Sequence, residues 1–484
     1  MSSDNLNKSI VKGVSWNLLE SLSLYIIRFV IGIVLARLLS PSDYGLIAML
    51  TIFLAISEKL VTAGFGQAYV KKKDADNVDA TTIFWINMSI SLILYIALFF
   101  GAPLISRFFH QEQLTLLLRV LAIIIIIRAL NVIQYAMIRK NMQFKRKAII
   151  TTISSVGSGI IGVACAYSGL GVWSLVIQQI SSNAILCILF YLTSKWKPSL
   201  LFSFASAKAM FSYGGWLFLC NLFETAMNYI YKVIIGRRYD SSDLGLYERG
   251  HQYPSLVSDT FTWIFGVVAF PSMTKIQDDK LGMHALSHKY VLYSCLIIFP
   301  LITWLMIAAE PLVLLLITDK WIECVPYLRL VCIATYITPV VFFFHPLLQA
   351  FGFSKRDFET SIVLAFLRII NVLFAIKMGI MALLYGEIIV MLSYLIIISL
   401  RNRKILGHNY LTVLWDIKWI IVATIFSVVA GSLLMPFIGG ASQILQIILS
   451  FIVVYAVFII ILTVFQRNVL FSGLSIIKMV FNKK

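Results

Sequence analysis

The amino-acid sequence predicts an all-α integral membrane protein with about fourteen transmembrane helices in two homologous halves. Of its 484 residues, 60% are hydrophobic and only 13% are charged, and the mean hydropathy is +0.91. A water-soluble domain could not cover that much apolar surface, so lipid is the solvent for most of the chain. Long apolar windows and an internal repeat support the same fold class.

Fourteen apolar windows are long enough to cross the hydrocarbon core of a bilayer, which takes about 20 helical residues. They fall at 14–37, 45–66, 82–103, 115–138, 148–168, 171–194, 212–236, 245–270, 288–310, 325–350, 358–377, 379–400, 416–436 and 443–465. The polar residues before the first window lack the short apolar stretch and small-residue cleavage site of a secretory signal, so we expect this window to remain as a span.

A repeat with a fixed offset of 200 residues relates the segment 16–66 to the segment 216–266. Polar and aromatic matches carry the comparison, because apolar matches arise easily by chance in a membrane protein. They are Trp16 with Trp216, Arg37 with Arg237, Ser42 with Ser242, Asp43 with Asp243, Gly45 with Gly245, and Gly66 with Gly266. Each copy is expected to form a helix, a polar turn that caps the next helix, and a second helix. Such repeats are typical of transporters built from two halves.

The distribution of Lys and Arg predicts that both chain ends are cytoplasmic, because cytoplasmic segments carry the excess of these residues. In that orientation, 26 of the 40 basic residues lie in inner segments, six lie in outer turns and eight lie within spans. The net charge of +18 is therefore explained without a nucleic-acid partner.

Two segments outside the spans are expected to lie along the cytoplasmic membrane surface. Residues 195–211 form a basic, aromatic-rich linker between a lobe at 1–194 and a lobe at 212–400. Two further helices occupy 401–465, and the tail 466–484 alternates apolar residues with lysines. That tail suits an amphipathic helix on anionic lipid; the alternative is a solvated end.

No motif for catalysis, nucleotide binding or metal binding is present. The six cysteines are scattered without ligand-like spacing, and the chain has no P-loop, no HExxH and no nucleophile elbow. We therefore expect neither an enzyme nor a metal or organic cofactor.

Charges within the spans are the informative residues, because burying a charge in hydrocarbon is costly unless it faces a cavity or a partner. They are Glu20, Arg28, Glu58, Lys59, Arg119, Arg128, Glu224, Lys232, Glu248, Arg249, Asp259, Arg329, Arg368 and Glu387. A cavity between the halves could hold an anionic substrate through Arg28, Arg128, Lys232 and Arg368. The alternative is that acids and bases neutralise one another as structural pairs, which we favour for Lys59, Arg119, Arg249 and Arg329.

Three further residues are candidates for coupling transport to Na⁺ or H⁺, namely Glu20, Glu224 and Asn371. Glu20 and Glu224 each precede a basic residue by eight positions, Arg28 and Lys232 respectively. Eight residues span about 12 Å of helix, too far for a direct pair, so each charge needs a partner on another helix. His345, next to Pro346, is interpreted as a packed histidine beside a kink rather than as a proton relay.

Four motifs together resemble one family, the bacterial polysaccharide flippases of the Wzx type. They are VKGVSW at 11–16, LARLLSPSDYG at 35–45, GFG at 64–66 and FPSMTKIQDD at 270–279. The resemblance covers essentially the whole chain and points to the colanic-acid and teichuronic-acid exporter branch of the multidrug/oligosaccharidyl-lipid/polysaccharide exporter superfamily. It implies two homologous six-helix lobes around a central cavity, plus two additional C-terminal helices.

The same resemblance implies the function. Undecaprenyl-pyrophosphate-linked oligosaccharide repeat units would be moved from the inner to the outer leaflet of the bacterial cytoplasmic membrane by alternating access, coupled to a proton or sodium gradient. Its partners would be this substrate, membrane lipids, and the polysaccharide polymerase with its chain-length machinery.

Two alternatives remain open. A multidrug exporter of the same superfamily would present acids to cationic drugs, which the abundance of intramembrane bases disfavours. A membrane glycan polymerase or ligase would need a sizeable outer loop, and the longest outer segments, near 104–114 and 311–324, are short.

Overall fold

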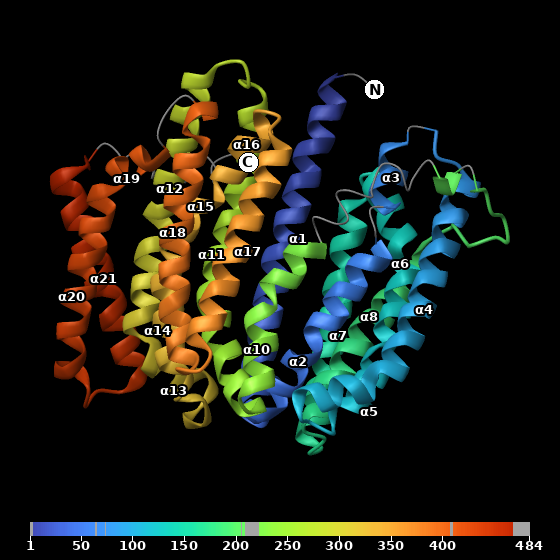
Figure 1. Ribbon diagram of the computed structural model, residues 1–484, viewed down its shortest axis with the longest axis horizontal. Helices are drawn as coiled ribbons and strands as arrows, with labels where there is room; N and C mark the ends of the chain where they lie inside the picture. Colours follow the sequence, from blue (N-terminus) through green and yellow to red (C-terminus); the bar gives the residue numbers. More distant parts are fainter. Residues whose placement is uncertain are drawn as a thin grey trace. The chain divides into compact units, whose positions relative to one another are not determined.

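The computed structural model describes residues 3–62, 65–72, 74–204, 206–208, 222–406 and 410–467, and those residues form helices and connections without a β-strand (Figure 1). The chain divides into two compact units, Met1–Gly245 and Leu246–Lys484. The predicted all-α class is confirmed. The lobe boundaries predicted at 194 and 212, and the arrangement of the lobes around a cavity, stay predictions.

The helices of the first unit are bounded as follows. They are α1 (Ser3–Leu38), α2 (Pro41–Thr62), α3 (Phe65–Lys71), α4 (Asn77–Phe109), α5 (Leu114–Leu121), α6 (Ile123–Lys140), α7 (Phe144–Tyr167), α8 (Val172–Thr193) and α10 (Ile230–Arg238). The long helix α11 (Ser241–Thr274) begins in this unit and continues into the second.

The second unit continues with ten further α-helices and two short 3-10 turns among its described residues. They are α12 (Lys280–Ile307), α13 (Ala309–Ile317), η1 (Asp319–Trp321), α14 (Cys324–Thr335), α15 (Thr338–Phe342), α16 (Phe344–Ala350), α17 (Ser354–Ala375), α18 (Ile380–Leu406), η2 (Tyr410–Thr412), α19 (Val413–Asp416), α20 (Lys418–Ile438) and α21 (Gln443–Phe465).

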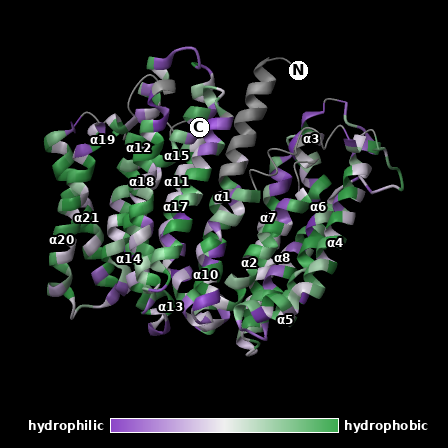
Figure 2. Cartoon of the chain, in the orientation of Figure 1, coloured by the Kyte–Doolittle hydropathy of each residue, from purple (hydrophilic) through white to green (hydrophobic). Residues whose placement is uncertain are grey.

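Within the described residues, 11 helices are long and apolar enough to cross a membrane, or up to 12 when the bent pair Cys324–Thr335 and Thr338–Ala350 counts as one span. Each predicted window corresponds to one of these except 212–236 and 245–270. The first ten residues of 212–236 lie outside the described part, and 245–270 lies within α11. Figure 2 shows hydrophobic residues along the middle of most helices and hydrophilic residues near their ends. The chain is a multi-pass membrane protein, and the count of fourteen stays a prediction.

In the first unit, α7 packs between α1 and α8, while α4 packs on α5 and α6. The start of the predicted linker 195–211 is fastened to α4, since Trp196 Nε1 donates to Asn77 Oδ1 at 2.7 Å and Trp85 Nε1 donates to the Ser199 carbonyl at 2.8 Å. The end of the linker, at 209–211, lies outside the described residues.

The two repeated turns touch each other at equivalent positions. A Cβ added to Gly45 would lie 1.7 Å from the Ser241 carbonyl oxygen, and one added to Gly245 would lie 1.9 Å from the Pro41 carbonyl oxygen. The Ser42 and Ser241 hydroxyls are hydrogen-bonded at 2.6 Å. Both glycines are therefore required by the close approach of two backbones, and the offset of 200 residues relates one contact to the other.

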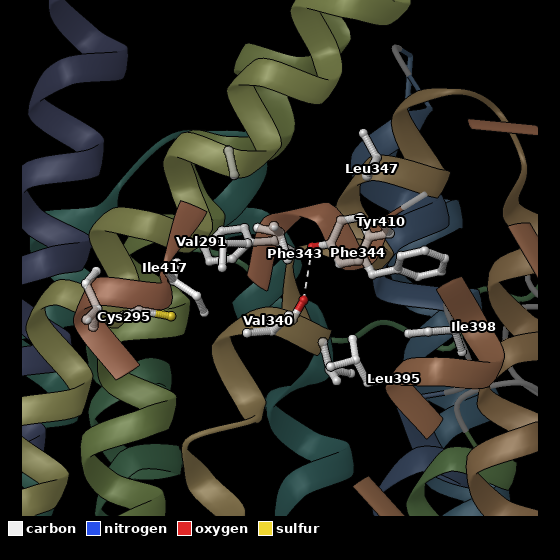
Figure 3. Close-up of a cluster of buried hydrophobic side chains, with 14 of the residues drawn as sticks. Val291, Cys295, Val340, Phe343, Phe344, Leu347, Leu395, Ile398, Tyr410 and Ile417 are labelled. Atoms are coloured by element: carbon white, nitrogen blue, oxygen red, sulfur yellow. Dashed lines mark hydrogen bonds between the residues drawn. The ribbon is translucent and has the colours of Figure 1, made fainter. Parts of the chain in front are cut away.

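The second unit has a large apolar core made by α12, α15, α16, α18 and α19. Figure 3 shows Phe343, Phe344 and Tyr410 meeting in this core, where the Tyr410 hydroxyl donates to the Val340 carbonyl at 3.0 Å. Helices α20 and α21 lie side by side (Figure 1). A buried tyrosine hydroxyl needs such a partner, so this bond fixes η2 against α15.

Some predictions concern residues outside the described part of the chain. They are the amphipathic tail from 468 onwards, the second copy of the repeat up to residue 221, including Trp216, and Gly64 of the third motif.

Candidate functional site

Arg128 of α6 forms the centre of a polar cluster in the first unit. Its guanidinium pairs with the Glu58 carboxylate of α2, and its Nε donates to Asn183 Oδ1 of α8 at 3.2 Å. Asn183 is oriented in turn, because its amide donates to the Gln179 carbonyl at 2.8 Å. The Arg128 and Glu58 side chains are 37% and 47% exposed. This pair is thus fixed in direction yet open to a competing ligand.

Glu20 of α1 occupies a more enclosed position and is paired with α7. Its carboxylate is only 5% exposed, lies 3.2 Å from Lys147 Nζ and accepts a hydrogen bond from Thr151 Oγ1 at 3.0 Å. Tyr135 of α6 lies within electrostatic range of both Glu20 and Arg128. The expectation that the partner of Glu20 lies on another helix is confirmed.

The remaining predicted residues of the first unit are more exposed and less enclosed. Arg28 is exposed on α1, and within the described residues its side chain makes no ion pair. Lys232 of α10 is half-buried, with Nζ 5.1 Å from the centroid of the Tyr229 ring. Glu224 is exposed in the helical stretch 222–228.

Arg368 of α17 and Glu387 of α18 form the corresponding pair in the second unit. Arg368 donates to Glu387 Oε1 through NH2 at 2.9 Å and through Nε at 3.2 Å, and the two side chains are only 16% and 12% exposed. Beside this pair, Asn371 Nδ2 donates to the Leu383 carbonyl at 3.0 Å, and its Oδ1 fills the space over Gly386. Asn371 and Gly386 therefore set the register in which Arg368 meets Glu387.

The structure brings some predicted site residues into clusters within each unit and leaves others apart. Arg128 and Glu20 lie in one polar region of the first unit, and Arg368 and Asn371 lie one helical turn apart in the second. Arg28, Lys232 and Glu224 join neither cluster through a contact described above. The role of each residue in binding substrate or ion stays a prediction.

Three bases that we interpreted as structural have contacts of that kind. Arg119 donates to the Phe99 carbonyl, Arg249 to Gln252 Oε1 at 2.7 Å, and Arg329 lies 3.8 Å from Glu310. Their partners lie near in space and give no convergent site.

Sequence reasoning missed Lys147, Thr151 and Asn183. Lys147 was counted with the inner loop, but α7 begins at Phe144, so Lys147 stands in the first turn of the helix and reaches Glu20. The unpaired Glu20 in the first span was the available signal, since it required a base on a neighbouring helix. Asn183 and Thr151 resemble ordinary interhelical hydrogen-bonding residues and gave no signal.

The clusters can bind anions by exchange of partners. An arginine that is held by a carboxylate, yet is more than a third exposed, can transfer its hydrogen bonds to a phosphate, which matches the guanidinium geometry. No group of three or more His, Cys, Asp or Glu side chains suited to a metal ion occurs among the described residues.

Comparison with known proteins places this chain among proteins of polysaccharide biosynthesis. A family described as "Polysaccharide biosynthesis protein" matches residues 34–326, which is more than half of the chain. The lipopolysaccharide biosynthesis protein WzxC of Escherichia coli (strain K12) is 23% identical over 418 residues, covering 84% of this chain and 83% of the relative. The succinoglycan biosynthesis transport protein ExoT of Rhizobium meliloti (strain 1021) is 24% identical over 347 residues, covering 71% and 70%.

Two solved structures share the fold. A lipid II flippase MurJ in an inward closed conformation matches with a TM-score of 0.72 at 13% identity, covering 93% of this chain and 99% of that one. An inward-facing multidrug resistance MATE family transporter matches with a TM-score of 0.60 at 14% identity, covering 80% and 94%. The fold is thus that of the superfamily named from the sequence motifs. The chain is a multi-pass membrane protein that belongs to the polysaccharide biosynthesis protein family of Wzx-type transporters.

Proposed function

We propose that this chain is a flippase for undecaprenyl-pyrophosphate-linked oligosaccharide repeat units. It moves them from the inner to the outer leaflet of the bacterial cytoplasmic membrane, with both chain ends in the cytoplasm, for the synthesis of O-antigen, capsule or exopolysaccharide. The observation that carries this proposal is the family match over residues 34–326. The relatives' names support it, since they include a transport protein for succinoglycan and a teichuronic acid biosynthesis protein.

The fold supports the same proposal from a second direction. The solved structure that covers 93% of this chain is titled a lipid II flippase, and that name refers to a lipid as the transported molecule. A carrier whose substrate has a charged head and a lipid tail needs cationic groups within its spans, where water cannot solvate the head. Both units supply such groups.

Arg128 is the residue best placed to receive the pyrophosphate. Its pair with Glu58 is open enough for a ligand to compete, and Asn183 keeps the guanidinium in place while the carboxylate is displaced. Lys232, half-buried in the same unit, offers a second cation. Arg28 and Arg368 remain further candidates. Substrate binding would release Glu58, which links occupancy of the site to the contact between α2 and α6.

Alternating access would require the contact between the repeated turns to open and close. Gly45 and Gly245 permit it only because neither carries a Cβ. We expect Gly45→Val to block this contact and to reduce export at least about tenfold while the protein remains in the membrane, because its Cβ would meet the Ser241 backbone. Retention of wild-type export by this variant would show that the contact is dispensable. A proton or sodium gradient would drive the cycle, with Glu20, Glu224 and Asn371 as candidates.

The test is complementation of a strain that lacks its own flippase. Arg128→Ala and Lys232→Ala should reduce surface polysaccharide by about tenfold or more, as expected when a charged hydrogen bond to the substrate is lost. The matched control is Arg329→Ala, which removes an arginine from an exposed pair with Glu310 and should leave export unchanged. Membrane levels of each variant are measured by immunoblot. Unchanged export by both cavity variants would contradict the cationic site.

A multidrug exporter is the second candidate, and the shared fold with a MATE family transporter favours it. Overexpression would then raise resistance to cationic drugs. A rise in resistance without any restoration of surface polysaccharide would replace the flippase proposal. A glycan polymerase or ligase is the weakest candidate, and formation of a sugar bond by the purified protein would establish it.

A further inference from the structure

A bent span in the second unit carries a histidine that the proposed site does not use. The helices Cys324–Thr335 and Thr338–Ala350 meet at an angle of 43°, and Pro339 stands at the start of the second segment. His345 lies on α16, the last part of this span, between Phe344 and Leu347, which are packed in the apolar core (Figure 3).

Both ring nitrogens of His345 face polar groups on neighbouring helices. Nδ1 lies 2.6 Å from Asp357 Oδ1 of α17, and Nε2 lies 3.4 Å from the Tyr394 hydroxyl of α18. The other carboxylate oxygen, Asp357 Oδ2, accepts a hydrogen bond from Gln349 Nε2 at 2.7 Å. The side chains of His345 and Asp357 are 29% and 15% exposed, and Tyr394 is fully buried. This histidine is thus more than the packed residue that the sequence suggested.

The other charged groups near α16 have partners of their own. On α17 and α18, the Glu359 carboxylate is shared by Arg401 at 2.7 Å and Arg356 at 3.6 Å. On α12, which also packs on α16, His288 pairs with Asp416. The remaining titratable groups on these faces are Lys355, Tyr290, His284 and Tyr410. Asp357 is therefore the carboxylate that contacts His345.

We propose that His345 and Asp357 form a proton-binding site that couples the bend of this span to a proton gradient, an inference that rests on the proposed transport function. In the unprotonated state, neutral His345 donates Nδ1–H to the Asp357 carboxylate and accepts the Tyr394 O–H at Nε2. An added proton binds at Nε2 and produces an imidazolium, which donates from both nitrogens. The Tyr394 hydrogen then turns away, and the charge of the pair changes from −1 to 0.

The chemistry gives this site a direction. A single negative charge held away from water is unfavourable, so the pair favours the proton when it is enclosed and releases it when water reaches the carboxylate. Because α16 belongs to the bent span and α17 to the next one, movement at the bend changes the distance between His345 and Asp357. Proton binding and the conformation of the span are therefore linked.

Nuclear magnetic resonance of ¹⁵N-histidine-labelled full-length protein in nanodiscs tests the site without transport. His345→Asn assigns the resonance. We expect His345 to titrate between about pH 5 and 8, and Asp357→Asn to lower its midpoint by about 1 pH unit or more. Gln349→Met, which removes a donor to the carboxylate from an exposed position, should raise the midpoint and serves if Asp357→Asn does not fold. His110→Asn, in the first unit, is the control and should leave the midpoint unchanged. Absence of titration, or a midpoint unaffected by the Asp357 and Gln349 variants that fold, would overturn the proposal.

Proteoliposomes provide the coupling arm, with a fluorescent undecaprenyl-pyrophosphate-linked N-acetylglucosamine as the probe. An imposed pH gradient should accelerate movement of the probe by the wild type and have no effect on His345→Asn, in which the asparagine amide still donates to Asp357 but cannot take up a proton. A gradient response of wild-type size in His345→Asn would overturn the coupling role. If the wild type does not move the probe, the proposed function fails, and the titration alone decides whether the proton site exists.

Discussion

Two arginine–glutamate pairs within the spans have the same chemistry and different surroundings. Arg128–Glu58 in the first unit joins α6 and α2 with side chains that are 37% and 47% exposed. Arg368–Glu387 in the second unit joins α17 and α18 with side chains that are 16% and 12% exposed. The first pair can exchange its carboxylate for a ligand, whereas the second is enclosed by the helices that it joins.

This difference separates two roles for charges in a membrane transporter. Removal of one partner from an enclosed pair leaves a charge without compensation, so its cost is paid by the fold. Removal of one partner from an open pair costs little stability, because solvent can replace the lost contact. Effects on transport can therefore be read cleanly at Arg128, while effects at Arg368 contain a large contribution from folding.

Arg368→Ala should break the comparison most strongly. It leaves the Glu387 carboxylate buried without its guanidinium, and we expect a loss of about 3–5 kcal/mol in the free energy of unfolding. Thermal unfolding of the purified protein in detergent measures the loss. The double variant Arg368→Met with Glu387→Gln removes both charges and should recover much of it; a double variant as unstable as Arg368→Ala would show that the pair is not the cause.

Gly386→Ala tests the same region without changing a charge. Its Cβ would lie 1.7 Å from Asn371 Oδ1, so α17 and α18 must shift, at a cost of about 1–3 kcal/mol. Gly101→Ala in α4 is the control, because a Cβ there meets nothing within 4 Å and alanine favours the helix. Adding Asn371→Ala to Gly386→Ala should restore stability by making room. Failure of that rescue would point to another obstacle.

Arg128→Ala sharpens the comparison through its small effect. Because both side chains of its pair are more than a third exposed, we expect a change of no more than about 1 kcal/mol in the free energy of unfolding. Thermal unfolding measured beside Arg368→Ala checks this. A loss as large as that of Arg368→Ala would place Arg128 among the structural pairs and would remove the basis for its proposed role.

Much of the fold could be predicted from sequence because hydrophobicity and length determine a membrane span. The repeat at an offset of 200 residues also located the turns in which Gly45 and Gly245 meet their symmetry-related carbonyls. Helix ends were harder to predict, because a helix continues past its apolar window. That is why Lys147 was assigned to a loop, although it stands in α7 and holds Glu20.

The site was predictable only as a set of single charges. A charge within a span is visible in the sequence, but its partner depends on which helix faces it. The sequence therefore named Arg128 and Arg368 without indicating that one pair is open and the other enclosed. His345 was interpreted as a packed residue for the same reason, since Asp357 and Tyr394 reach it from two other helices.

The most direct test of the proposed function is lipid-linked sugar movement in proteoliposomes that contain the purified chain. We predict that the wild type moves a fluorescent undecaprenyl-pyrophosphate-linked sugar between leaflets, and that Arg128→Ala, with nearly wild-type stability, does so at least about tenfold more slowly. No movement by the folded wild type, or equal rates for the two proteins, would contradict the account.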